Sequence, residues 1–230
     1  MTMVASRSPA RGRLPIADHV FAVAARRYSR AARDTGGFMT AVLSRYARRK
    51  KLDHFFAGID KDARVLEVGC ADGWVGQYAV AGGWQRFTGI DAVAPPAAPP
   101  HPFVLGDVRQ WPRLGLEPGS YDVVVAFDVI EHGDLFDAMA ALLRPGGRLM
   151  VTTPVPHLDW ACRLLECLGL AERRTSPRTH LIYLRDLPEE FRPVETSVRG
   201  GLSQWGVFER VPHPSDADGP AFQWAAAQAP

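Results

Sequence analysis

The amino-acid sequence predicts an α/β fold, with a doubly wound, mostly parallel sheet preceded by an N-terminal helical extension. Two observations lead to this prediction. From Arg64 onward, short apolar runs alternate with helical stretches, which is typical of repeated βα units. Before that point, apolar residues recur at helical spacing. The length of 230 residues fits one domain, and 47% hydrophobic and 23% charged residues are values typical of globular proteins.

The N-terminal part is expected to comprise a flexible leader, residues 1–17, and a helical cap, residues 18–57. In the cap, a helix from Asp18 to about Arg33 is followed by a pair of glycines and a second helix over Phe38–Phe56. The second helix sets apolar residues on one side and arginines on the other, so we expect it to be amphipathic.

Residues 58–211 are expected to form the sheet domain, followed by a Pro/Ala-rich flexible tail over 212–230. The expected strands are Arg64–Val68, Arg86–Ile90, Phe103–Gly106, Tyr121–Phe127, Arg148–Thr152, Val194–Leu202 and Trp205–Val211. The expected helices are Trp74–Ala81, Asp134–Leu143 and Leu158–Leu168. The proline-rich stretch 94–102 cannot form a helix, because proline removes an amide donor and clashes with the preceding turn. We therefore expect a stiff loop there in place of a crossover helix.

Positive charge is concentrated at the N-terminus. Through Lys51 the chain carries 12 basic and two acidic residues, a net charge of +10, so that the remainder carries about −8. No apolar run approaches the roughly 18 residues of a membrane span, and the N-terminus lacks the apolar core of a secretory signal. The three cysteines cannot form a disulfide framework. We expect a cytoplasmic protein.

The ends of four predicted strands indicate a ligand site. A glycine-containing turn, residues 69–73, joins the first strand to a helix, whose first amide groups are free to bind a ligand. The next three strands end at Asp91, at Asp107 and at Asp128. Because the carboxyl ends of parallel strands meet at one edge of a sheet, these groups should converge, and Asp91 is placed to accept ribose hydroxyls.

The order of these motifs resembles that of class I S-adenosylmethionine-dependent methyltransferases, in particular the small-molecule group that includes the ubiquinone-biosynthesis enzymes. The resemblance covers about residues 50–210 and rests on the segments VLEVGC, DVVVAFDVIEH and LLRPGGRLMVTTP. It implies a seven-stranded sheet with the last strand antiparallel, and S-adenosylmethionine as cofactor. The cofactor contacts that it implies are Glu67, Gly69, Cys70, Ala71, Gly73, Asp91, Ala92, Asp107, Val108 and Asp128. In this chain, Ala71 stands where the family usually has glycine.

Methyl transfer from a sulfonium requires alignment of donor and acceptor and exclusion of water, and a base can assist when the acceptor loses a proton. The candidate catalytic residues are His132, His180 and Asp128, and His157 is a weaker candidate. Each histidine could instead have a structural role, and we expect His101 to lie on the surface. We expect a small-molecule acceptor, in some cases anionic, with a hydroxyl favoured because many members of the resembled family methylate hydroxyls.

Other classes of protein fit less well. The chain has no phosphate-binding Gly-Lys-Ser/Thr loop, no nucleophile elbow and no histidine cluster for a metal, so we expect no metal cofactor. A dinucleotide oxidoreductase would need the G-x-G-x-x-G spacing, which is missing. The alternative is a methyltransferase-fold protein with little or no catalysis, whose basic N-terminal helices bind an anionic partner: a phosphorylated or lipid-linked glycan, or a nucleic acid. Nucleic acid is not the expected partner.

Overall fold

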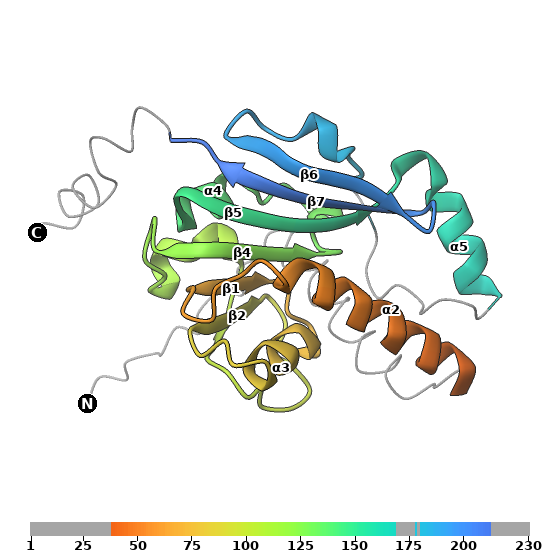
Figure 1. Ribbon diagram of the computed structural model, residues 1–230, viewed down its shortest axis with the longest axis horizontal. Coiled ribbons are helices and arrows are strands. Elements are labelled where there is room, and N and C mark those ends of the chain that lie inside the picture. The colour runs from red at the N-terminus through yellow and green to blue at the C-terminus, as the bar shows by residue number, and fades with distance from the viewer. Residues whose placement is uncertain (1–37, 169–177, 179, 213–230) are drawn as a thin grey trace, which may run out of the picture.

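The computed structural model describes residues 38–168, 178 and 180–212. They form one seven-stranded sheet in the order β3-β2-β1-β4-β5-β7-β6 (Figure 1). The strands are β1 (Val65–Val68), β2 (Phe87–Asp91), β3 (Phe103–Leu105), β4 (Tyr121–Phe127), β5 (Leu143–Pro154), β6 (Phe191–Arg199) and β7 (Ser203–Arg210). The first five strands pair in parallel, whereas β7 is antiparallel to both β5 and β6. The predicted fold class is confirmed.

Helices cover both faces of the sheet. The helices are α2 (Phe38–Phe56), α3 (Trp74–Ala81), α4 (Phe136–Leu142) and α5 (Asp159–Cys167). On one face, α2 and α3 pack against Val123 and Val125 of β4. On the other face, α4 packs against Val124 and Ala126 of the same strand. The alternation of buried residues along β4 therefore produces the doubly wound arrangement, since successive side chains point to opposite faces.

The element boundaries differ from the prediction mainly near the C-terminus. The strand predicted over Val194–Leu202 instead occupies β6 and ends at Arg199, because Gly200 and Gly201 take positive φ values and turn the chain into β7. β5 is longer than predicted at both ends, with Leu143 already paired to Tyr121. The leader, the helix predicted from Asp18 and the tail lie outside the described residues, apart from Pro212.

The proline-rich stretch between β2 and β3 is a loop, as predicted. The surface position predicted for His101, which ends this loop, is wrong, because the side chain is buried. Its ring packs edge-on against Phe87, with ring centroids 4.9 Å apart. Gly76 and Gly89 provide the space for it: a Cβ atom on either would come within 2.8 Å of the imidazole. The pattern of the loop alone contains no sign of this packing.

Among the described helices, none is both long enough and apolar enough to cross a membrane.

Candidate functional site

The candidate site lies at the sheet edge where β1, β2, β4 and β5 end, close to the C-terminal half of α2 (Figure 1). Backbone hydrogen bonds continue past the strands and hold this edge together. Gly69 N–H donates to Ile90 O over 2.9 Å, and Asp128 N–H donates to Thr152 O over 2.8 Å. The predicted convergence of strand ends is therefore present in the structure.

The turn after β1 depends on three residues with positive φ. Gly69 and Gly73 take φ values of 77° and 74°, and Ala71 takes 43°. Gly69 has a second reason to be glycine, because an added Cβ would lie 2.5 Å from Val129 Cγ2. Ala71 occupies the left-handed region, which costs an alanine about 1 kcal/mol. The family's usual glycine at this position thus has a backbone explanation.

Asp91 holds this turn in place. Its Oδ2 accepts the Ala71 N–H over 2.8 Å, and its Oδ1 accepts the Val93 N–H over 2.9 Å. Burial raises the pKa of Asp91, although the backbone N–H groups of Ala71, Val93 and Ala92 and the nearby His132 oppose the shift. Each carboxylate oxygen retains a second lone pair, so the same group can also accept a hydrogen bond from a ligand. Ala92 itself is exposed beside it.

Glu67 is a deeply buried carboxyl group of the site, with 3% of its surface exposed. Burial, reinforced by the charges of Asp91 and Asp72, raises its pKa to about 8. Its Oε2 is buried without a hydrogen-bond partner among the described residues. Burial likewise raises the pKa of the Cys70 thiol, so this side chain stays protonated and acts as an apolar filler. This oxygen is therefore one position of the site that the protein itself leaves without a hydrogen bond.

The raised pKa of Glu67 predicts a pH-dependent stability. The folded protein keeps the Glu67 proton up to about pH 8, whereas the unfolded chain releases it at an ordinary carboxyl pKa, so the free energy of unfolding falls as the pH rises between these values. Glu67→Gln removes this loss, and we expect the variant to gain about 1–3 kcal/mol over the wild type at pH 9. Urea unfolding at pH 5 and pH 9 measures the difference. The exposed Glu189→Gln is the control, and equal gains at both pH values would contradict the prediction.

The acid that follows β3, Asp107, differs from those at the ends of β2 and β4 in that its partner is the next arginine in the sequence. Asp107 caps a 3-10 segment, η1 (Val108–Leu114), by accepting the Arg109 N–H over 3.0 Å, and it also pairs with the Arg109 guanidinium. Desolvation would raise the pKa of Asp107, but this pairing outweighs it and lowers the pKa. The Val108 side chain is buried in the core, so only its backbone can meet a ligand. Asp107 is thus already satisfied within the protein.

Asp128 lies in an ion pair that the sequence did not reveal. Lys51 of α2 reaches Asp128 Oδ2 over 2.6 Å and Thr152 Oγ1 over 3.1 Å, and the Thr152 hydroxyl lies 3.1 Å from Asp128 Oδ1. Desolvation raises the pKa of Asp128, but the Lys51 ammonium outweighs it, so the net shift is downward. Lys51 stood within a run of basic residues, and only its place before the apolar Leu52 and near Phe55 indicated that it faces the protein.

A second ion-pair group lies beyond Asp128 and was also missed. Glu131 is almost fully buried; its Oε1 lies 3.4 Å from Arg178 Nε and its Oε2 accepts the Thr153 hydroxyl over 3.3 Å. Burial, with the charge of Asp128 next, raises the pKa of Glu131 to about 7. Arg178 also bonds Asp159 at the start of α5 over 2.8 Å. These contacts join residues far apart in sequence, so no local pattern predicts them.

The structure places the predicted proton acceptors along this edge. His132 ends a 3-10 turn, η2 (Ile130–His132), and its charge acts on Asp91. The His180 N–H donates to Glu131 O over 2.9 Å. His157, the weaker candidate, hydrogen-bonds through Nδ1 to the Tyr183 hydroxyl over 2.9 Å. Within the part of the chain that the structure describes, no three His, Cys, Asp or Glu side chains are grouped to hold a metal ion.

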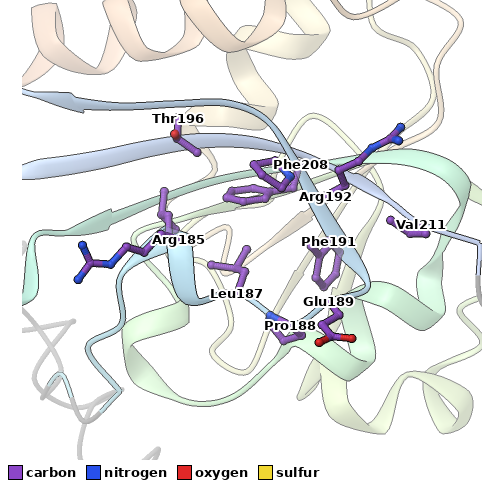
Figure 2. Close-up of a pocket in the computed structure, with 11 residues that line it drawn as sticks. Arg185, Leu187, Pro188, Glu189, Phe191, Arg192, Thr196, Phe208 and Val211 are labelled. Carbon is purple, nitrogen blue, oxygen red and sulfur yellow. The ribbon is translucent and has the colours of Figure 1, made fainter.

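A cavity of about 490 Å³ lies elsewhere in the fold. Apolar side chains of Leu187, Phe191 and Phe208 line it, with Arg185 and Arg192 beside them (Figure 2). None of the predicted site residues contributes to its wall. We place the candidate site at the strand ends, because the free carboxylate lone pairs and the orphaned Glu67 oxygen are there.

Sequence comparisons identify the family. A profile described as a methyltransferase domain matches residues 39–192, more than half of the chain. The ubiquinone biosynthesis O-methyltransferase of Aeromonas salmonicida is 31% identical over 102 residues, which cover 39% of this chain and 42% of the relative. A probable S-adenosylmethionine-dependent methyltransferase of Mycolicibacterium smegmatis is 36% identical over 114 residues, 46% of this chain and 42% of the relative. The chain thus aligns with less than half the length of these relatives.

Solved structures agree on the fold. The 1,6-didemethyltoxoflavin-N1-methyltransferase of Burkholderia thailandensis superposes with a TM-score of 0.52 at 17% identity, covering 89% of this chain and 95% of the other. The geranyl diphosphate C-methyltransferase of Streptomyces coelicolor A3(2) gives a TM-score of 0.52 at 15% identity, covering 73% and 79%. At these identities the likeness concerns the fold alone. With the profile match, it identifies the chain as a member of the class I S-adenosylmethionine-dependent methyltransferase family.

Proposed function

We propose that this chain transfers a methyl group from S-adenosylmethionine to a small molecule, with a hydroxyl oxygen as acceptor. The observation that carries the proposal is the set of groups at the strand ends: the orphaned buried Glu67, the half-buried Asp91 and the Lys51–Asp128 pair. The choice of oxygen rests on the ubiquinone-biosynthesis relatives, which are named O-methyltransferases. This chain aligns with less than half of the length of these relatives.

The groups at the edge fit the two ends of the cofactor. In this proposal, Asp91 accepts the ribose hydroxyls through its unused lone pairs. The methionine end is a zwitterion, and the Lys51 ammonium beside the Asp128 carboxylate offers one charge to each of its two charged groups. Glu67 Oε2 is free to accept a further donor. Asp107 already pairs with Arg109 and is left with a smaller part in binding.

When bound, S-adenosylmethionine supplies a methyl group on a positively charged sulfur, and this sulfur is the leaving group when an acceptor attacks the methyl group in line. The protein then has to align the acceptor and exclude water. α2 lies against the edge through Lys51 and through the buried Phe55, which packs on Phe127 at the end of β4. The proton of a hydroxyl acceptor would pass to His132, His180 or Asp128, each at or bonded to the segment that follows β4.

Titration calorimetry of the full chain with S-adenosylmethionine and with S-adenosylhomocysteine tests the proposal. We expect one molecule of either ligand per chain. A panel of phenols, catechols and sugars with labelled S-adenosylmethionine then tests the acceptor, with mass spectrometry to locate the methyl group. Absence of binding would overturn the proposal, and a product methylated on nitrogen or carbon would overturn the choice of oxygen.

The same calorimetry separates this proposal from the alternative of an anionic-partner protein with little catalysis. That alternative has support in the exposed Arg49 and Lys50 of α2, which follow a basic N-terminal segment. It predicts binding to an anionic partner with no methylated product from any acceptor. Cofactor binding with turnover on one acceptor would exclude it.

A further inference from the structure

Helix α5 is oriented opposite to an ordinary surface helix. The apolar side chains Trp160 and Leu164 of α5, and Leu168 directly after it, are spaced four residues apart and therefore lie on one face; they are 64%, 51% and 63% exposed. The polar Asp159, on another face, is buried. A surface helix normally turns its apolar stripe toward the core. The arrangement in α5 leaves an exposed apolar stripe, which we call the α5 stripe and define as these three residues.

Ion pairs fix this orientation. Asp159 Oδ1 accepts from Arg178 over 2.8 Å and its Oδ2 accepts from Arg163 over 3.0 Å. Arg178 in turn pairs with the buried Glu131 at the end of β4. Rotating α5 to bury the stripe would separate Asp159 from Arg178, whose guanidinium also pairs with the buried Glu131. The stripe therefore faces outward because of contacts at the candidate site.

A second aromatic group is exposed at the same end of the molecule. α2 and α5 both extend to the end where β4 and β5 finish (Figure 1). On α2, Tyr46 is 62% exposed, and the Lys50 ammonium lies 5.7 Å from its ring centroid. Exposed aromatic residues with adjacent lysines suit the boundary between lipid and water. In α2 itself Arg49 and Lys50 are exposed, and the sequence through Lys51 has a net charge of +10; positive charge of this kind complements anionic headgroups.

We propose that this end of the protein, with the α5 stripe and Tyr46, docks on the surface of an anionic lipid bilayer. Size argues for lipid over a second copy of the chain. The stripe exposes roughly 350 Å², taking about 150 Å² for a full leucine and about 250 Å² for a full tryptophan side chain, whereas a stable dimer buries about 800 Å² per partner. A bilayer needs only a few inserted apolar side chains once basic residues hold the protein at the surface. The proposal does not depend on methyl transfer.

Flotation with vesicles of equal parts phosphatidylglycerol and phosphatidylcholine tests the proposal on the full chain. We expect wild-type protein to float with these vesicles, to float at least tenfold less with pure phosphatidylcholine, and to be released by high salt. Trp160→Ser/Leu164→Ser should lower the floating fraction at least tenfold. The matched control is Val194→Ser/Val198→Ser on β6, which removes two other exposed apolar side chains and should leave flotation unchanged.

Two further measurements keep the result interpretable. S-adenosylmethionine calorimetry on the Trp160→Ser/Leu164→Ser variant checks its fold, and if neither protein binds the cofactor, circular dichroism does so instead. Sedimentation velocity measures the oligomeric state. Equal flotation of wild type and this variant overturns the proposal, as does failure of the wild type to float. A wild-type dimer that this variant dissociates also overturns it and assigns the stripe to a second copy.

Discussion

Asp91→Ala should weaken S-adenosylmethionine binding by at least about 100-fold. The substitution removes a charged acceptor of ribose hydroxyls and also the hydrogen bonds that hold the Ala71 and Val93 N–H groups. A hydrogen bond to a charged group contributes about 1.5–3 kcal/mol, so losing two from a bound ligand corresponds to a factor of this size. Ala71 also loses the contact that helps hold it at φ 43°, so the turn loses its shape. Titration calorimetry at pH 7.5 measures the change.

Two variants serve as controls for Asp91→Ala. Asp91→Asn keeps the size of the side chain and one acceptor oxygen, and we expect an intermediate loss of about tenfold. Asp107→Asn removes a carboxylate that already pairs with Arg109, so its effect on cofactor affinity should be smaller than that of Asp91→Asn. Thermal unfolding of each variant separates a lost contact from a lost fold. If Asp91→Ala bound as tightly as Asp107→Asn, the assignment of Asp91 to the ribose would be wrong.

The sequence predicted those parts of the site that local pattern determines. Strand β1, the turn through Gly69 and the positions of Asp91 and Asp128 follow from alternating apolar runs that each end in a glycine or an acid. Parallel pairing then brings these ends together whatever the side chains between them are. The confirmed part of the prediction, the order and the ends of the strands, thus rests on hydrophobic periodicity and on topology.

The missed residues act through contacts between distant segments. Lys51 meets Asp128 across 77 residues of sequence, and Arg178 bonds Asp159 across 19. The helical pattern predicted α5 but not which of its faces packs against the protein, because the ion pair between Asp159 and Arg178 decides which face turns inward. Such pairings can be predicted only when the spatial order of the strands is known. In this fold β4 and β5 are neighbours, whereas a long connection separates β5 from β6 in the sequence.

Lys51→Met should weaken S-adenosylmethionine binding about tenfold at pH 7.5 and more steeply in acid. Losing the ammonium removes one charge partner of the methionine end and the group that lowers the pKa of Asp128. Desolvation is then unopposed by Lys51, so the Asp128 pKa rises. In the wild type Asp128 stays ionised down to below its ordinary pKa, whereas in the variant binding should begin to fall at a higher pH. Calorimetry between pH 5 and 8.5 follows this shift.

Comparison with Lys51→Arg and Asp128→Asn distinguishes an electrostatic role from simple packing of α2. Lys51→Arg keeps the charge, so it should keep the wild-type pH dependence even if the guanidinium fits less well between Asp128 and the Phe127 ring. In an Asp128→Asn background, Lys51→Met should cost less than in the wild type, because only the direct contact of Lys51 with the ligand is then lost and the carboxylate whose ionisation Lys51 maintains is already gone. Equal losses in both backgrounds, with no change in pH dependence, would mean that Lys51 does not act by keeping Asp128 ionised.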